Sequence, residues 1–213
     1  MQRRTFSALT LGALSSMPFA PAFAQTGFKE GTDYFKLSQA VPTEAGKGRI
    51  EVLEFFWYNC PHCNSFEPTL SAWSKKLPKD VEVKRVPVRF RAEFEPQQRA
   101  YYVLEALGKV EELQGKMFAA IHTERQTLTT LEPLLGWAEK NGITKKQFTD
   151  LYNSFTVIGK ARRAAQLQEQ FKVEGVPALG VAGRFYVDGS LAGSMDRALQ
   201  VVDFLLGEVR KGR

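Results

Sequence analysis

The chain has 213 residues, of which 44% are hydrophobic and 24% are charged, so it can bury a sizeable core and is not intrinsically disordered. Its formal net charge is +6, and the basic residues are spread along the sequence without a long block of like charge. This distribution argues against a nucleic-acid-binding arm, and we expect no nucleic-acid partner.

The first 24 residues have the pattern of a secretory signal peptide. Arg3 and Arg4 precede a weakly apolar stretch, and small residues ending in Ala22-Phe23-Ala24 form an A-x-A cleavage pattern. The paired arginines also resemble a twin-arginine export signal, so the Sec and Tat routes both stay open. We therefore expect residues 1–24 to be removed on export, which places the mature protein in an oxidising compartment.

The segment after the signal peptide predicts three strands and one helix. Residues 35–41 predict a short strand, and the β-prone run 50–57 predicts a strand that is buried on both faces. A helix follows, because Pro61 suits a first helical position and apolar residues recur at helical spacing through Leu77. Valines over residues 81–88 then predict another strand. A strand, helix and strand in succession indicate two parallel strands joined by a right-handed crossover.

The middle of the chain, residues 91–171, has helical patterns and no strand signal. Amphipathic patterns begin near Pro96, Val110, Leu131, Thr144 and Val157.

The β character returns after this helical block. Residues 178–181 and 184–187 predict a hairpin, and Ser194 is placed to cap a final amphipathic helix. Strand-forming segments on both sides of the block predict an α/β fold with an inserted all-helical domain. Its α/β part then comprises residues 25–90 and 172–213.

The chain has only two cysteines, Cys60 and Cys63, and they flank Pro61 and His62 at the junction of the predicted strand and helix. A disulfide between them closes a very short loop and stabilises the fold little. A closed zinc site needs four ligands, and only two histidines are present to complete one. We therefore interpret the cysteines as a redox-active pair, and we expect no metal and no other cofactor.

The position of Cys60 at the start of a helix predicts its chemistry. Unpaired N–H groups and the helix dipole favour a thiolate there, and a protonated or hydrogen-bonding His62 favours it further. Cys63 lies one turn on, within disulfide reach and deeper in the helix. Cys60 is thus the expected attacking and leaving sulfur, and Cys63 the resolving one. A stabilised thiolate favours the reduced form, which makes the disulfide a good oxidant.

Two other positions fit a redox site. Glu54 lies on the buried strand, where a carboxyl needs either a partner or an exchangeable proton. We favour a proton relay to Cys63, and an ion pair with Arg85 on the parallel strand is the alternative. A cis Val176-Pro177 bond would present a backbone edge to a substrate peptide, although the residues alone favour the common trans form.

His122 lies near the end of an inserted helix, where a cation suits the helix dipole. We predict no function for it.

The segments VLEFFWYNCPHCNSFEP and GVPAL resemble the DsbA family of thiol:disulfide oxidoreductases, within the thioredoxin superfamily. The resemblance covers essentially the whole mature chain, and CPHC is specific for the DsbA type. It implies a thioredoxin-like fold with a helical insertion. The site residues that it implies are the nucleophile Cys60, its buried partner Cys63, His62 and Pro61 between them, the cis-proline loop Val176-Pro177, and the buried acid Glu54 with its basic partner Arg85.

The same resemblance implies a periplasmic dithiol oxidase, acting as a monomer, that donates its Cys60–Cys63 disulfide to unfolded or folding secreted polypeptides. A membrane oxidase of the DsbB type would then reoxidise it. One alternative is a disulfide reductase or isomerase, which is disfavoured because His62 should shift the couple the other way. A non-catalytic binding module that keeps the fold is the second alternative.

Overall fold

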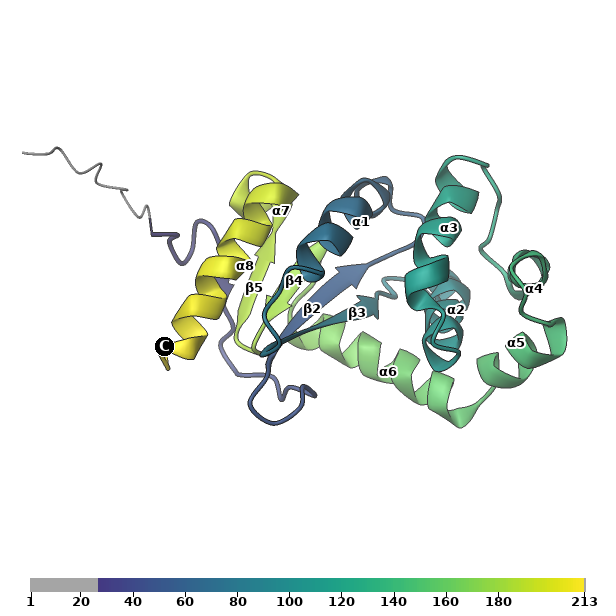
Figure 1. The fold of residues 1–213 in the computed structure, drawn as a ribbon, viewed down its shortest axis with the longest axis horizontal. Helices are drawn as coiled ribbons and strands as arrows, with labels where there is room; N and C mark the ends of the chain where they lie inside the picture. The colour runs from purple at the N-terminus through teal and green to yellow at the C-terminus, as the bar shows by residue number, and fades with distance from the viewer. Residues whose placement is uncertain (1–26, 213) are drawn as a thin grey trace, which may run out of the picture.

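A computed structural model describes residues 27–212, so the expected signal peptide lies outside the described residues. Five strands form one mixed sheet in the order β1-β5-β4-β2-β3. Figure 1 labels β5, β4, β2 and β3 in this order across the sheet. The central strand β2 is parallel to β3 and antiparallel to β4, and its long apolar run is buried on both faces as predicted. The strands are β1 (Phe35–Lys36), β2 (Ile50–Phe56), β3 (Val81–Pro87), β4 (Ala178–Val181) and β5 (Phe185–Asp188).

Helices cover both faces of the sheet. On one face, α1 (Pro61–Ser74) and the final helix α8 (Met195–Arg210) lie side by side (Figure 1), and their apolar residues pack with Val52 of β2. On the other face, Phe55 of β2 packs against Phe171, just after α6, with ring centroids 5.3 Å apart. The sheet therefore has a separate apolar core on each side.

The chain between β3 and β4 is helical, as the amphipathic patterns predict. No helix in residues 27–212 is long and apolar enough to cross a lipid bilayer. The elements here are the short η1 (Ala92–Phe94), α2 (Glu95–Ala106), α3 (Val110–His122), α4 (Leu131–Lys140), α5 (Lys145–Tyr152) and α6 (Phe155–Gln170), and a further short helix, α7 (Gly189–Ala192), precedes α8.

Two predicted element boundaries are wrong. The strand expected over residues 35–41 is regular for only two residues, because Leu37 and Val41 bond to the hairpin turn at Arg184 and Gly183 without a continuous ladder. Helix α1 ends at Ser74 and not near Leu77. Leu77, the last apolar residue of the predicted helix, lies in the tighter turns that follow α1, where its N–H donates to the Ser74 carbonyl.

The turn of the predicted hairpin lies at the opposite end of β4 from Pro177. Ala182 and Gly183 both have positive φ, at 53° and 65°, and the Arg184 N–H donates to the Val181 carbonyl at 2.9 Å. A Cβ on Gly183 would lie 1.9 Å from the Val41 carbonyl oxygen, so this position accepts only glycine. The hairpin turn therefore does not border the cysteine end of the sheet.

Candidate active site

The two cysteines lie at the carboxyl end of the central strand, where α1 begins. Cys60 is the N-cap residue, and its sulfur accepts the Cys63 backbone N–H at 3.4 Å. Pro61 occupies the first helical position, where its missing N–H leaves no bond unmade. Both thiols are free, Cys63 is fully buried, and Cys60 keeps 8% of its surface exposed. Cys60 is therefore the sulfur that a substrate can reach.

Hydrogen bonding and burial act in opposite directions on the two thiols. The Cys63 thiol lowers the pKa of Cys60 to about 6 by hydrogen bonding, against the effect of burial and with help from the backbone N–H groups of Cys63 and His62. His62 is exposed, and its charge makes the smallest of these contributions. Burial and the adjacent Cys60 raise the pKa of Cys63. Near neutral pH the pair is therefore a Cys60 thiolate beside a Cys63 thiol.

The loop before β4 meets Cys60 from the other side. The Val176-Pro177 peptide is cis, as the resemblance implies and against the trans form that the residues alone favour. The Cys60 sulfur lies 3.3 Å from the Val176 carbonyl oxygen, to which it donates a hydrogen bond in its protonated form. Because β2 and β4 pair with Phe55 opposite Ala178, the sheet brings together two loops that are 116 residues apart in the sequence.

Glu54 lies within β2, fully buried, and stands opposite Arg85 in the parallel register of β3. Arg85 Nη1 lies 3.0 Å from Glu54 Oε2, so the ion pair considered as the alternative is present. Burial nevertheless outweighs this pairing and, together with Glu67, raises the pKa of Glu54 to about 7. Its Oε1 has no hydrogen-bond partner within the described part of the chain. A carboxyl in this state can bind and release a proton near neutral pH.

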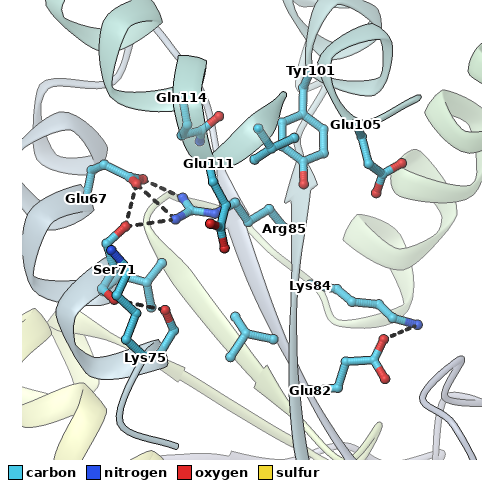
Figure 2. A pocket seen from close by; sticks show the side chains of 14 residues that line it. Glu67, Ser71, Lys75, Glu82, Lys84, Arg85, Tyr101, Glu105, Glu111 and Gln114 are labelled. Atoms are coloured by element: carbon cyan, nitrogen blue, oxygen red, sulfur yellow. Dashed lines mark hydrogen bonds and ion pairs between the residues drawn. The ribbon is translucent and has the colours of Figure 1, made fainter. Parts of the chain in front are cut away.

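Glu67 of α1 completes this charged cluster and was not predicted. Both terminal nitrogens of Arg85 bond to its carboxylate, and the Ser71 hydroxyl donates to Glu67 Oε1 at 3.0 Å (Figure 2). Although burial acts to lower it, the pKa of Arg85 is raised by Glu54 and Glu67. The sequence held one signal for Glu67, because it follows Cys63 by four residues and so shares its helix face.

A cavity of about 450 Å³ adjoins this cluster, and Figure 2 shows its lining residues. Glu67, Ser71 and Arg85 line it from α1 and β3, and Tyr101 and Gln114 line it from α2 and α3. The buried Glu54 thus connects through Arg85 to a polar space. Among residues 27–212, no three or more His, Cys, Asp or Glu side chains are grouped so that they could hold a metal ion.

Comparison with known proteins gives one consistent family. Residues 51–200 match the model of the DSBA-like thioredoxin domain. The chain is 37% identical over 202 residues to a thiol:disulfide interchange protein DsbA from Burkholderia cepacia, covering 95% of this chain and 92% of that protein. It is 39% identical over 214 aligned residues to the protein of the same name from Bordetella pertussis, covering 99% of this chain and 100% of that one.

The fold is similar to solved structures as well. A crystal structure of Pseudomonas aeruginosa DsbA matches with a TM-score of 0.82 and 36% identity, covering 87% of this chain and 96% of that chain. The oxidoreductase DsbA from Xylella fastidiosa matches with a TM-score of 0.80 and 28% identity, covering 86% of this chain and 98% of that chain.

Proposed function

The chain belongs to the DsbA family, with a thioredoxin-like fold and a helical insertion, and from this premise we propose that it oxidises exported polypeptides with its Cys60–Cys63 disulfide. The observation that carries the proposal is the position of Cys60 as N-cap of α1, where its sulfur accepts the Cys63 N–H and hydrogen bonding lowers its pKa. Stabilising this thiolate stabilises the reduced enzyme, so transfer of the disulfide to a substrate is favourable. An acidic nucleophilic cysteine is already known in DsbA.

The proposed reaction is a two-step thiol–disulfide exchange. A substrate thiolate attacks Cys60 of the oxidised enzyme, forming a mixed disulfide and releasing Cys63, which takes up a proton. A second substrate thiolate then attacks the substrate sulfur of the mixed disulfide, and Cys60 leaves as a thiolate. The substrate loses two electrons and gains a disulfide, while the enzyme is reduced to the Cys60 thiolate and the Cys63 thiol.

The remaining site residues have proposed roles in these steps. His62 adds a smaller stabilisation of the Cys60 thiolate, and Pro61 begins the helix that provides the N–H groups. Val176 and Pro177 present a backbone edge beside the reacting sulfur, where an extended substrate peptide can bind. Glu54, with Arg85 holding it in place, supplies the proton that Cys63 needs when it leaves in a fully buried position.

The proposed setting is the periplasm, because the N-terminal sequence has the signal pattern described above. The substrates would be unfolded or folding secreted polypeptides, and a membrane oxidase of the DsbB type would regenerate the disulfide. No cofactor beyond the cysteine pair is needed, since the disulfide itself carries both electrons. We propose that the protein acts as a monomer.

The titration of Cys60 tests this function. We expect the thiolate absorbance of the reduced protein to report a pKa of about 6. A value near the 8.5 of a free cysteine would contradict the proposal. The equilibrium with glutathione gives a second measurement. A potential close to that of thioredoxin, about −270 mV, would instead favour the reductase alternative.

The proton-relay role of Glu54 predicts a pH dependence of stability. Its pKa rises from 4.5 in the unfolded chain to about 7 in the folded protein, so the folded state holds this proton more tightly. The bound proton stabilises the folded state fully below pH 4.5, and this stabilisation is lost as the pH rises to about 7. The free energy of unfolding should fall by about 3 kcal/mol at most over this range. We expect Glu54→Gln to remove this dependence in urea unfolding experiments.

The oxidised protein is the suitable sample, because its disulfide abolishes the separate titration of Cys60. Identical pH profiles for the wild type and Glu54→Gln would show that Glu54 does not hold a proton in this range.

A further inference from the structure

A β-turn of residues 57–60 carries the chain from β2 into α1. The Cys60 N–H donates to the Trp57 carbonyl at 3.0 Å, which closes the turn. The Trp57 backbone also hydrogen-bonds to the Cys63 sulfur, and the Cys60 side chain projects from the last residue of the turn. The placement of both sulfurs therefore depends on the conformation of these four residues.

The peptide between Tyr58 and Asn59 is the part of the turn that the closing hydrogen bond does not fix. Rotation of this peptide converts a type I turn into a type II turn, which requires positive φ at the third residue. Asparagine accepts positive φ better than most residues, so Asn59 alone does not prevent the rotation. Asn59 does not have positive φ in this structure. A contact to the Tyr58 carbonyl would favour the observed orientation over the rotated one.

His122, the last residue of α3, makes that contact. Its Nε2 lies 2.8 Å from the Tyr58 carbonyl oxygen, the atom that would turn away if the peptide rotated. Because a carbonyl only accepts hydrogen bonds, Nε2 must carry the hydrogen. Tyr58 is only 1% exposed, so without His122 its carbonyl would lose this partner in a buried environment.

We propose that His122 is a positioning residue for thiol–disulfide exchange, which holds the Tyr58–Asn59 peptide so that the Cys60 sulfur faces the Cys63 N–H and the Val176 carbonyl. The inference rests on the proposed function. It gives His122 a role that the sequence did not predict.

The helical insertion also contacts the side chains of the three turn residues before Cys60. The residues that make these contacts belong to η1, α2 and α3. These contacts are the stacking of Trp57 on Phe94 with centroids 3.8 Å apart, a hydrogen bond from the Tyr58 hydroxyl to Gln114 Oε1 at 2.6 Å, and one from Gln97 Nε2 to Asn59 Oδ1 at 2.5 Å.

Three variants test the role of His122. His122→Met keeps the approximate side-chain volume and removes the donor, whereas His122→Gln keeps an N–H at a similar reach. Gln98→Met is the matched control, because Gln98 Nε2 also donates to a buried carbonyl, that of Pro87 at 2.9 Å, but not to the turn. The measurements are the Cys60 pKa, the equilibrium constant with glutathione and the stability to urea.

We expect His122→Met to raise the Cys60 pKa by about one unit. The glutathione equilibrium should then shift about tenfold toward the enzyme disulfide, which is about 30 mV. His122→Gln should restore both values, and Gln98→Met should leave both unchanged whatever its stability. An unshifted pKa in His122→Met, or an equal shift in Gln98→Met, would overturn the positioning role.

Failure of the function and failure of this inference can be told apart. An unshifted Cys60 pKa in the wild type overturns the function. A low Cys60 pKa in the wild type that His122→Met leaves unchanged overturns only the role of His122. If His122→Met does not fold, nitrogen NMR of the reduced wild-type protein decides. A ring protonated on Nε2 supports the hydrogen bond, and a ring protonated only on Nδ1 excludes it.

Discussion

Replacing Cys63 with alanine is expected to lower the rate of substrate oxidation at least about a thousandfold and to leave stable mixed disulfides on Cys60. The variant cannot form the donor disulfide. Its Cys60, which keeps 8% of its surface exposed, can still attack a disulfide in a substrate, and no second thiol remains to displace the bound polypeptide. Non-reducing gels of the variant with reduced and oxidised substrates measure both effects.

Serine at position 63 separates the two functions of that residue. The Cys63 side chain is the largest influence that lowers the pKa of Cys60, and a serine hydroxyl can donate the same kind of hydrogen bond. We therefore expect Cys63→Ser to trap substrates while keeping the Cys60 pKa below that of Cys63→Ala. Cys60→Ala is the control, and it should form no adducts. Adducts that persist in Cys60→Ala would contradict the assigned order of the sulfurs.

Replacing Arg85 with methionine is expected to destabilise the folded protein by about 3–5 kcal/mol at neutral pH. Arg85 is the shared partner of the Glu54 and Glu67 carboxylates, and its removal leaves both buried without a counter-charge. The loss should be smaller at acid pH, where Glu54 is protonated and no longer carries an unpaired charge. Urea unfolding of the oxidised protein at two pH values measures both effects.

Arg49→Met is the matched control for this experiment. Arg49 also pairs with a carboxylate from a neighbouring strand, Glu82, at 3.1 Å, but its side chain is 48% exposed. Exposed pairs contribute less than about 1 kcal/mol. Equal destabilisation in the two variants would show that the buried cluster is not held together by Arg85.

The sequence predicts the parts of this molecule that depend on local pattern. The apolar run of β2, the proline at the start of α1 and the hairpin each have local signals, and each is present. The ion pair of Arg85 with Glu54 was an alternative left open by the sequence, and the parallel register of β2 and β3 places the two residues opposite each other. The family resemblance added the cis form of Pro177, which the residues themselves do not favour.

The contacts that sequence reasoning missed cross between distant elements. His122 and Tyr58 are 64 residues apart, and nothing in either local pattern shows that a ring nitrogen meets a carbonyl. Sequence reasoning also did not identify the Cys63 thiol as an influence on the pKa of Cys60. This thiol acts at hydrogen-bond distance in a buried position, where electrostatic interactions are less screened, whereas the charge of His62 acts from an exposed position.

The separation of the two halves of the site has a consequence for biosynthesis. The cysteine turn emerges early from the ribosome or translocase, but the carbonyl of Val176 follows 116 residues later. Until β4 has been delivered and has paired with β2, a nascent molecule carries both sulfurs without the backbone edge that faces them. A chain still in transit therefore carries two thiols that β4 does not yet face, and the observed arrangement is complete only when residues 176–181 have arrived.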